Sequence, residues 1–194
     1  MISAGNDIVA LQAVDVQRTQ LPAFYSKFIT PTELSLHKPD EITLVNFVWL
    51  LWSAKESAYK YLKRYNPELV FAPIKLVVQQ LKASDNSYRN YIGEVSDGNV
   101  VLPFITTLNK DYIATIIDQG DVSWNVKQID ATDHKSQSQA VRDLLLDDLK
   151  MPDVSIQKHP NGYPVLIKNG QKLDIAVSFA HHARYVSYSF QILQ

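Results

Sequence analysis

The stretch WSAKESAYK, residues 52–60, lies within the longest helical pattern of the chain. Apolar residues recur at three- and four-residue steps across residues 46–64, which is the spacing of a helix with one face turned toward a core. On such a helix Glu56 and Lys60 lie one turn apart on the same flank. This flank borders the apolar face, so its charges can lie at the edge of the core. An exposed ion pair on the helix surface is the alternative.

Two other stretches accompany this helix. GNDIV occupies residues 5–9 and contains one acidic residue, and FYSKFITPTE occupies residues 24–33. Together the three stretches resemble the G-x-D-I, F-F-[ST]-x-x-E and W-S-x-K-E-S-x-x-K signatures of the 4′-phosphopantetheinyl transferase superfamily, in the order and spacing of that family. The resemblance is close over residues 5–65 and looser over the remainder of the chain.

The resemblance implies a transfer reaction. A 4′-phosphopantetheine group would move from coenzyme A to a serine of an acyl or peptidyl carrier protein, as in the holo-acyl-carrier-protein synthases of fatty acid biosynthesis. Asp7 and Glu56 would bind a magnesium ion, which prefers oxygen ligands. Glu56 would also act as general base for the serine hydroxyl, and Lys60 would stabilise the leaving phosphate.

The C-terminal part resembles the half that comes first in the larger, two-lobed transferases. SFAH at residues 178–181 resembles their S-x-S-H motif, NGYP at residues 161–164 resembles their N-x-x-G-K-P segment, and Arg142 resembles the arginine of the preceding helix. Because these stretches follow the G-x-D-I signature here, the two halves look circularly permuted. The resulting candidates for contact with coenzyme A are His181, Arg142, Tyr163 and Lys158.

These candidates have structural alternatives. His181 could be a histidine satisfied at a strand end, Arg142 a solvated helix arginine, and Tyr163 part of a hairpin turn. His134 and Lys135, just before a predicted helix, could add positive charge at the same phosphate.

The chain departs from the family pattern at Asn6, which is polar where the family prefers an apolar residue, and at three further positions. Val9 stands where the larger transferases carry a further acid, Tyr163 where the family has lysine, and Ala180 where it has serine. These departures motivate a second hypothesis, a catalytically inactive transferase-like protein that binds a carrier protein or a nucleotide. A third hypothesis is an unrelated α+β interaction protein, in which Asp7 and Glu56 would lie far apart.

The pattern after residue 73 changes to short apolar or alternating runs separated by turn residues, which predict antiparallel strands. We also expect a short strand at 8–11, a short helix at 21–28 and a second long helix at 135–150. The fold class is therefore α+β, with two pseudo-symmetric halves, residues 1–118 and 119–194, each a long helix packed on an antiparallel sheet. One compact unit with its site between the halves is expected. The predicted strands cover residues 74–81, 88–95, 100–105, 111–117, 122–129, 154–158, 163–167, 173–179 and 185–193.

Composition limits the class of protein. The chain has 194 residues, of which 46% are hydrophobic, a net charge of −1 and no cysteine. The charge gives no electrostatic basis for binding nucleic acid or an anionic membrane, and the absence of cysteine excludes disulfides and thiolate metal sites. The longest apolar run is too short to span a bilayer, and residues 1–7 do not resemble a signal peptide. We therefore expect a cytoplasmic protein with no nucleic acid or membrane partner. Because the chain contains both halves, the resemblance also implies a monomer.

Overall fold

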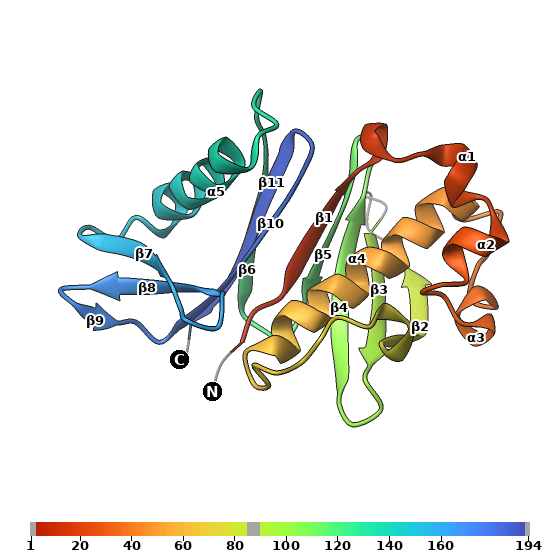
Figure 1. The fold of residues 1–194 in the computed structure, drawn as a ribbon, viewed down its shortest axis with the longest axis horizontal. Helices are drawn as coiled ribbons and strands as arrows, with labels where there is room; N and C mark the ends of the chain where they lie inside the picture. Colours follow the sequence, from red (N-terminus) through yellow and green to blue (C-terminus); the bar gives the residue numbers. More distant parts are fainter. Residues whose placement is uncertain (1–2, 85–89, 193–194) are drawn as a thin grey trace.

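The computed structural model describes residues 3–84 and 90–192. Its elements form an α+β fold of antiparallel sheets and two long helices, which confirms the predicted fold class (Figure 1). We refer to residues 3–117 as the N-terminal part and to residues 122–192 as the C-terminal part. No helix of the described residues is both long enough and apolar enough to cross a membrane.

The N-terminal part is a five-stranded sheet crossed by one long helix. Its strand order is β1-β5-β4-β3-β2. Three short helices, α1 (Val16–Thr19), α2 (Pro22–Tyr25) and α3 (Pro31–Leu34), connect β1 to the long helix α4 (Leu44–Lys63). The 3-10 turns η1 (Leu11–Ala13) and η2 (Pro73–Lys75) flank these segments. The strands are β1 (Asn6–Ala10), β2 (Val77–Ala83), β3 (Asn90–Ser96), β4 (Val101–Leu108) and β5 (Tyr112–Ile117).

The C-terminal part contains two three-stranded sheets and one long helix, α5 (His134–Leu149). One sheet has the order β10-β11-β6 and the other β7-β8-β9. The sequence predicted the helix and every strand of this part except β9, which lies between the predicted strands at 163–167 and 173–179. The separation into two sheets was not predicted either. The strands are β6 (Val122–Gln128), β7 (Val154–Lys158), β8 (Pro164–Lys168), β9 (Gln171–Lys172), β10 (Ile175–His182) and β11 (Tyr185–Ile192).

Most predicted elements agree with the structure to within a few residues. The helix expected at 46–64 begins two residues earlier because the Thr43 side chain accepts a hydrogen bond from the Asn46 N–H and caps it. The first strand begins at Asn6 rather than residue 8, so Asp7 lies within the strand. Residues 88–89 of the strand expected at 88–95, and residue 193 of the last one, lie outside the described residues.

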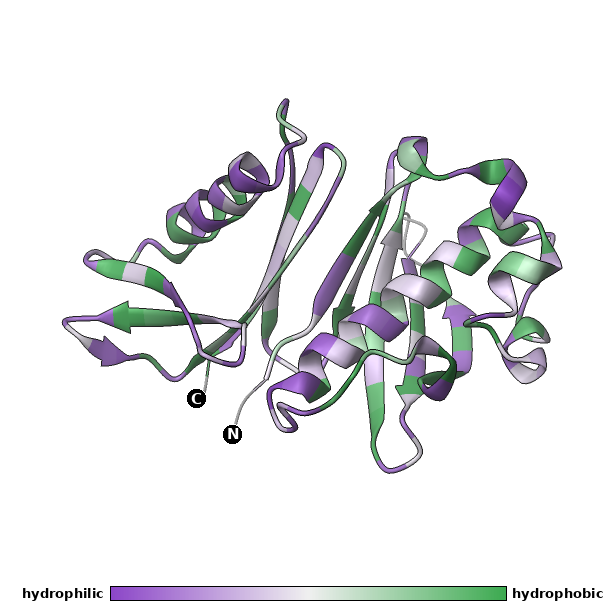
Figure 2. Cartoon of the chain, viewed as in Figure 1, coloured by the Kyte–Doolittle hydropathy of each residue, from purple (hydrophilic) through white to green (hydrophobic). Residues whose placement is uncertain are grey.

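Both long helices are amphipathic, as their periodicity predicts. Figure 2 shows hydrophilic and hydrophobic residues alternating along α4 and α5. Phe47, Leu50, Leu51 and Ala54 of α4 are completely buried against the five-stranded sheet. Val141 and Leu145 of α5 are buried against β10 and β11 in a separate core. The two parts therefore have separate hydrophobic cores.

A completely buried ion pair fixes the position of α4. The Lys55 ammonium group lies 2.7 Å and 2.9 Å from the two carboxylate oxygens of Glu33 and also donates to the Phe28 carbonyl. Glu33 further accepts from the N–H groups of Thr30 and Val78, each at 2.8 Å. Burial lowers the pKa of Lys55, and the hydrogen bond and charge of Glu33 oppose that shift. The pair thus joins α4 to α3 and β2.

Replacing Lys55 by methionine leaves the Glu33 carboxylate buried without its counter-charge. We expect Lys55→Met to lower the free energy of unfolding by about 3–5 kcal/mol in urea denaturation. The control is Lys38→Met, which breaks the exposed Lys38–Glu41 pair and should cost less than about 1 kcal/mol. Equally small losses in the two variants would contradict the structural role of the buried pair.

Candidate active site

A close approach between β1 and α4 brings the first carboxylate to the helix. A Cβ atom on Gly5 would lie 2.1 Å from the Ser57 carbonyl oxygen and 2.9 Å from the Tyr61 Cβ, so only glycine fits at this position. The Ser57 hydroxyl donates to the carbonyls of Ser53 and Thr115, which joins α4 to β5 at the same level. Asp7, two residues after Gly5, is consequently buried beside α4.

Lys60 connects Asp7 to Glu56. Its ammonium nitrogen lies 3.2 Å from Asp7 Oδ1 and 3.3 Å from Glu56 Oε1, and it donates to the Asn6 carbonyl at 2.9 Å. Burial lowers the pKa of Lys60, but the two carboxylates outweigh that effect and raise it overall. The helix flank shared by Glu56 and Lys60 therefore faces Asp7. The three residues form one cluster, so Glu56 and Lys60 are not an isolated ion pair on the surface.

The Asp7 carboxylate is well placed to accept a cation. Burial raises its pKa to about 7, an effect that Lys60 opposes and Glu56 increases. Its second oxygen, Oδ2, is buried and has no hydrogen-bond partner among the described residues. A buried, unpaired carboxylate oxygen is costly unless a cation or a donor contacts it.

Glu56 is oriented by a tryptophan. The Trp52 indole N–H donates to Glu56 Oε2 at 3.1 Å, and the same ring packs edge-on against Phe28 and Phe71. The sequence pattern assigned no site role to Trp52. Its four-residue distance from Glu56 was the available signal, because such residues are neighbours on a helix.

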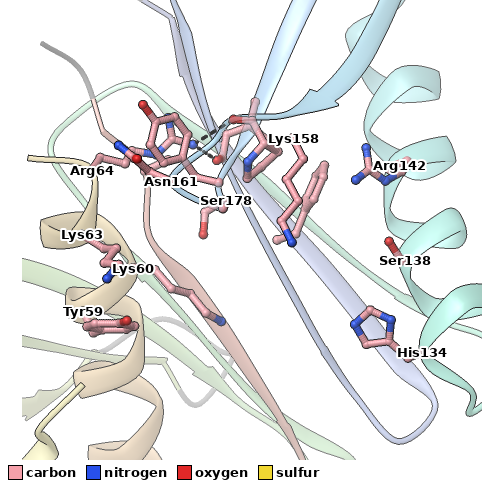
Figure 3. Close-up of a pocket in the computed structure, with 16 residues that line it drawn as sticks. Tyr59, Lys60, Lys63, Arg64, His134, Ser138, Arg142, Lys158, Asn161 and Ser178 are labelled. Atoms are coloured by element: carbon pink, nitrogen blue, oxygen red, sulfur yellow. Dashed lines mark hydrogen bonds between the residues drawn. The ribbon is translucent and has the colours of Figure 1, made fainter. Parts of the chain in front are cut away.

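A cavity of about 440 Å³ lies beside this cluster, between α4, α5, the β7–β8 turn and β10. Figure 3 shows α4 and α5 contributing side chains from opposite sides of it. No aspartate or glutamate is among the described residues that line it. Its wall carries six cationic or titratable basic side chains, Lys60, Lys63, Arg64, His134, Arg142 and Lys158.

The four candidates from the C-terminal part meet at this cavity. Arg142, Lys158 and Tyr163 line it directly. His181 contacts its wall, since its ring lies 5.1 Å from the ring of His134 in a perpendicular arrangement. Burial lowers the pKa of His181, and the nearby charges of His134 and Lys60 lower it further. The C-terminal candidates are therefore close to Lys60, although more than 70 residues separate Lys60 from each of them in the chain.

A family model described as the 4′-phosphopantetheinyl transferase superfamily matches residues 3–117, which is more than half of the chain. The chain belongs to this superfamily. The matched region contains Gly5, Asp7, Glu56 and Lys60, whereas the C-terminal part lies outside it. No curated protein and no solved structure matches the chain.

The structure shows what surrounds two of the positions at which the chain departs from the transferase pattern, Val9 and Ala180. Val9 lies on the same face of β1 as Asp7 but is buried in the hydrophobic core under α4. A second acid at this position would place a charge in that core. Ala180 is buried in a small cluster with Ile8 and Ala10, between the two parts. The site therefore has two carboxylates, Asp7 and Glu56.

Two further residues in or near the candidate site were not predicted. Arg64, immediately after α4, is buried and lines the cavity; the signal was a run of basic residues at the end of the helix. The His182 Nδ1 accepts a hydrogen bond from the Ala10 N–H at 3.0 Å, and burial lowers the pKa of this histidine. No sequence signal indicates that contact, since it forms only when β10 lies beside β1.

Gly5 tests the close approach of β1 to α4. A methyl group here would overlap the Ser57 carbonyl, so Gly5→Ala should lower the free energy of unfolding by about 1–3 kcal/mol in urea denaturation. Ser123→Ala, on an exposed position of β6, is the control and should change it by no more than about 0.5 kcal/mol. Full stability of Gly5→Ala would show that the two elements can move apart at no cost.

Proposed function

We propose that this protein transfers 4′-phosphopantetheine from coenzyme A to a serine of an acyl or peptidyl carrier protein, in a magnesium-dependent reaction. The observation that carries the proposal is the position of Lys60, which contacts both carboxylates and also lines the cationic cavity. Membership of the superfamily supports the reaction class.

The cavity has the charge required for coenzyme A, a ligand with a pyrophosphate and a 3′-phosphate. Lys63 on α4, with Lys158 and Arg142 across the cavity, supplies positive charge from both parts of the molecule. Arg142 lies over the Phe179 ring and donates to the Ile156 carbonyl at 3.2 Å, which fixes its guanidinium group at the wall. Such preorganised cations bind phosphate without reorganisation during the reaction.

Asp7 and Glu56 fit magnesium by the character of their donor atoms. Magnesium commonly takes one or two carboxylates together with phosphate oxygens and water, and Asp7 Oδ2 is a buried carboxylate oxygen without a partner. The described residues contain no group of three or more acidic, histidine or cysteine side chains suited to a metal. When bound, the ion neutralises negative charge on the pyrophosphate.

Glu56 is the general base in this proposal. It accepts the proton of the carrier serine as the serine oxygen attacks the β-phosphorus of coenzyme A, and the bond between that phosphorus and the bridging oxygen breaks. Adenosine 3′,5′-bisphosphate leaves with the bond electrons. The Trp52 N–H holds one Glu56 oxygen, and Lys60 stabilises the negative charge that develops on the leaving phosphate.

The arrangement of the chain supports a circularly permuted transferase that functions as a monomer. Both walls of the cavity come from one chain. The end of β11 and the start of β1 lie at the same end of the molecule, where a chain in the other order would continue directly (Figure 1). Permutation is tolerated where termini are close.

Mass spectrometry of an apo carrier protein tests the activity directly. We expect a phosphopantetheine adduct after incubation with this protein, coenzyme A and magnesium, and a rate at least about 100-fold lower for Glu56→Ala, because the general base is lost. Glu68→Ala, which removes an exposed carboxylate after α4, should leave the rate unchanged. No adduct with any of several carriers, from a folded protein that binds coenzyme A, would favour the inactive binding protein instead.

Removal of metal is a separate test. We expect excess EDTA to abolish adduct formation and added magnesium to restore it, because the Asp7 and Glu56 carboxylates repel the pyrophosphate unless a cation lies between them. Undiminished transfer in EDTA would contradict the assignment of Asp7 and Glu56 as metal ligands.

A further inference from the structure

Arg64 is a buried cation without a counter-charge. It follows α4 directly and is only 8% exposed, yet it lines the cavity. Burial lowers its pKa to about 10, so it remains protonated at neutral pH. No carboxylate of the described residues lies within ion-pair distance of it, unlike Lys55 and Lys60, the other buried or half-buried cations of α4 that have such partners.

Its hydrogen-bonding capacity is only partly used. One terminal nitrogen, Nη2, donates to the Val177 carbonyl on β10 and, at 3.3 Å, to the Pro164 carbonyl on β8. The other terminal nitrogen, Nη1, and Nε have no acceptor among the described residues. A guanidinium group has five N–H donors, so three of them are available to a ligand in the cavity.

A stack of rings fixes the orientation of the guanidinium group. Its central carbon lies 4.4 Å from the centre of the Tyr163 ring, and the His159 ring lies 4.3 Å from the same centre with only 8° between the planes. Two groups this close to one ring must occupy opposite faces, so Tyr163 is held between Arg64 and His159. Neither face of Tyr163 is then free for a base, and its contribution to the cavity is its edge.

The turn that carries Tyr163 is built to hold this stack. Gly162 has a φ of 94°, a conformation that favours glycine, and its N–H donates to the His159 carbonyl at 2.8 Å. The Asn161 N–H donates to the His159 ring nitrogen at 3.2 Å. The C-terminal part therefore holds Arg64 of the N-terminal part in one position at the cavity wall (Figure 3).

We infer that Arg64 binds a phosphate group of coenzyme A and is a determinant of the affinity of this site for its nucleotide substrate. The inference rests on the proposed function, because it takes the ligand of the cavity to be coenzyme A. An unpaired buried charge is costly, and a phosphate supplies both the missing counter-charge and acceptors for the remaining N–H groups. Arg64 is suited to a planar, two-point contact with phosphate that lysine does not provide.

Calorimetric titration with coenzyme A tests the inference, using wild type, Arg64→Met and Arg18→Met. Arg18 also lies over an aromatic ring, that of Phe24, but does not line the cavity, so its variant is the charge-matched control. We expect Arg64→Met to bind about 10- to 100-fold more weakly than wild type, as the loss of charged hydrogen bonds predicts, and Arg18→Met to bind equally well. Binding by Arg64→Met as tight as that of wild type would overturn the inference.

Salt dependence separates a phosphate contact from a purely structural role. A charge that contacts phosphate is screened by salt, so affinity for coenzyme A should fall less steeply with sodium chloride in Arg64→Met than in wild type. Weaker binding with an unchanged salt dependence would show that Arg64 only joins α4 to β8 and β10. Should Arg64→Met fail to fold by circular dichroism, Arg64→Gln keeps an amide donor for those carbonyls and undergoes the same titrations.

Titration with inorganic pyrophosphate distinguishes this inference from the proposed function. If wild-type protein binds pyrophosphate, Arg64→Met does not, and wild type does not bind coenzyme A, the proposed substrate is contradicted and the phosphate site at Arg64 is supported. Wild-type protein that binds neither would overturn both. If wild type and Arg64→Met bind coenzyme A equally well, the proposed function stands and the inference that Arg64 binds its phosphate is overturned.

Discussion

The buried ion pair between Lys55 and Glu33 sets the rotation of helix α4, and the site depends on that rotation. With Lys55 directed into the N-terminal part, the next residue, Glu56, lies about 100° around the helix and faces β1. Lys60 follows one turn later on the same flank, and Arg64 one turn after that at the cavity. A helix free to rotate by one residue would direct all three charges away from Asp7 and the cavity. The pair is thus a positional constraint, whatever its net contribution to stability.

Side-chain hydrogen bonds hold the two parts of the molecule together at β1. The Asn6 N–H donates to the Ser178 hydroxyl at 3.2 Å, the Asn6 amide donates to the Ser187 hydroxyl at 2.8 Å, and the Ala10 N–H donates to His182. β1 pairs with β5 through its backbone on one edge and with the C-terminal part through these side chains on the other. Asp7 therefore lies on the strand that joins the two parts. A ligand in the adjacent cavity would contact basic side chains of both parts.

The sequence predicted what depends on local spacing. The flank shared by Glu56 and Lys60 follows from helical periodicity alone, and their proximity to Asp7 followed from the resemblance of residues 5–65 to the transferase signatures. His182 and Arg64 were not given site roles, because each depends on a contact set by the fold. Arg64, for example, contacts residues of β8 and β10 that lie 100 and 113 positions further along the chain. The separate sheet β7-β8-β9 likewise could not be predicted, because a sequence pattern indicates where strands form but not which sheet each strand joins. Trp52 was also missed, although it lies one helical turn from Glu56.

The proposed function requires one ligand site built from both parts of the chain. Hydrogen–deuterium exchange of the backbone amides, with and without coenzyme A and magnesium, tests this arrangement. We expect slower exchange in the ligand-bound protein at the C-terminal end of α4 and also at the start of α5 and the β7–β8 turn. Slower exchange confined to the N-terminal part, with the C-terminal part unchanged, would contradict a composite site.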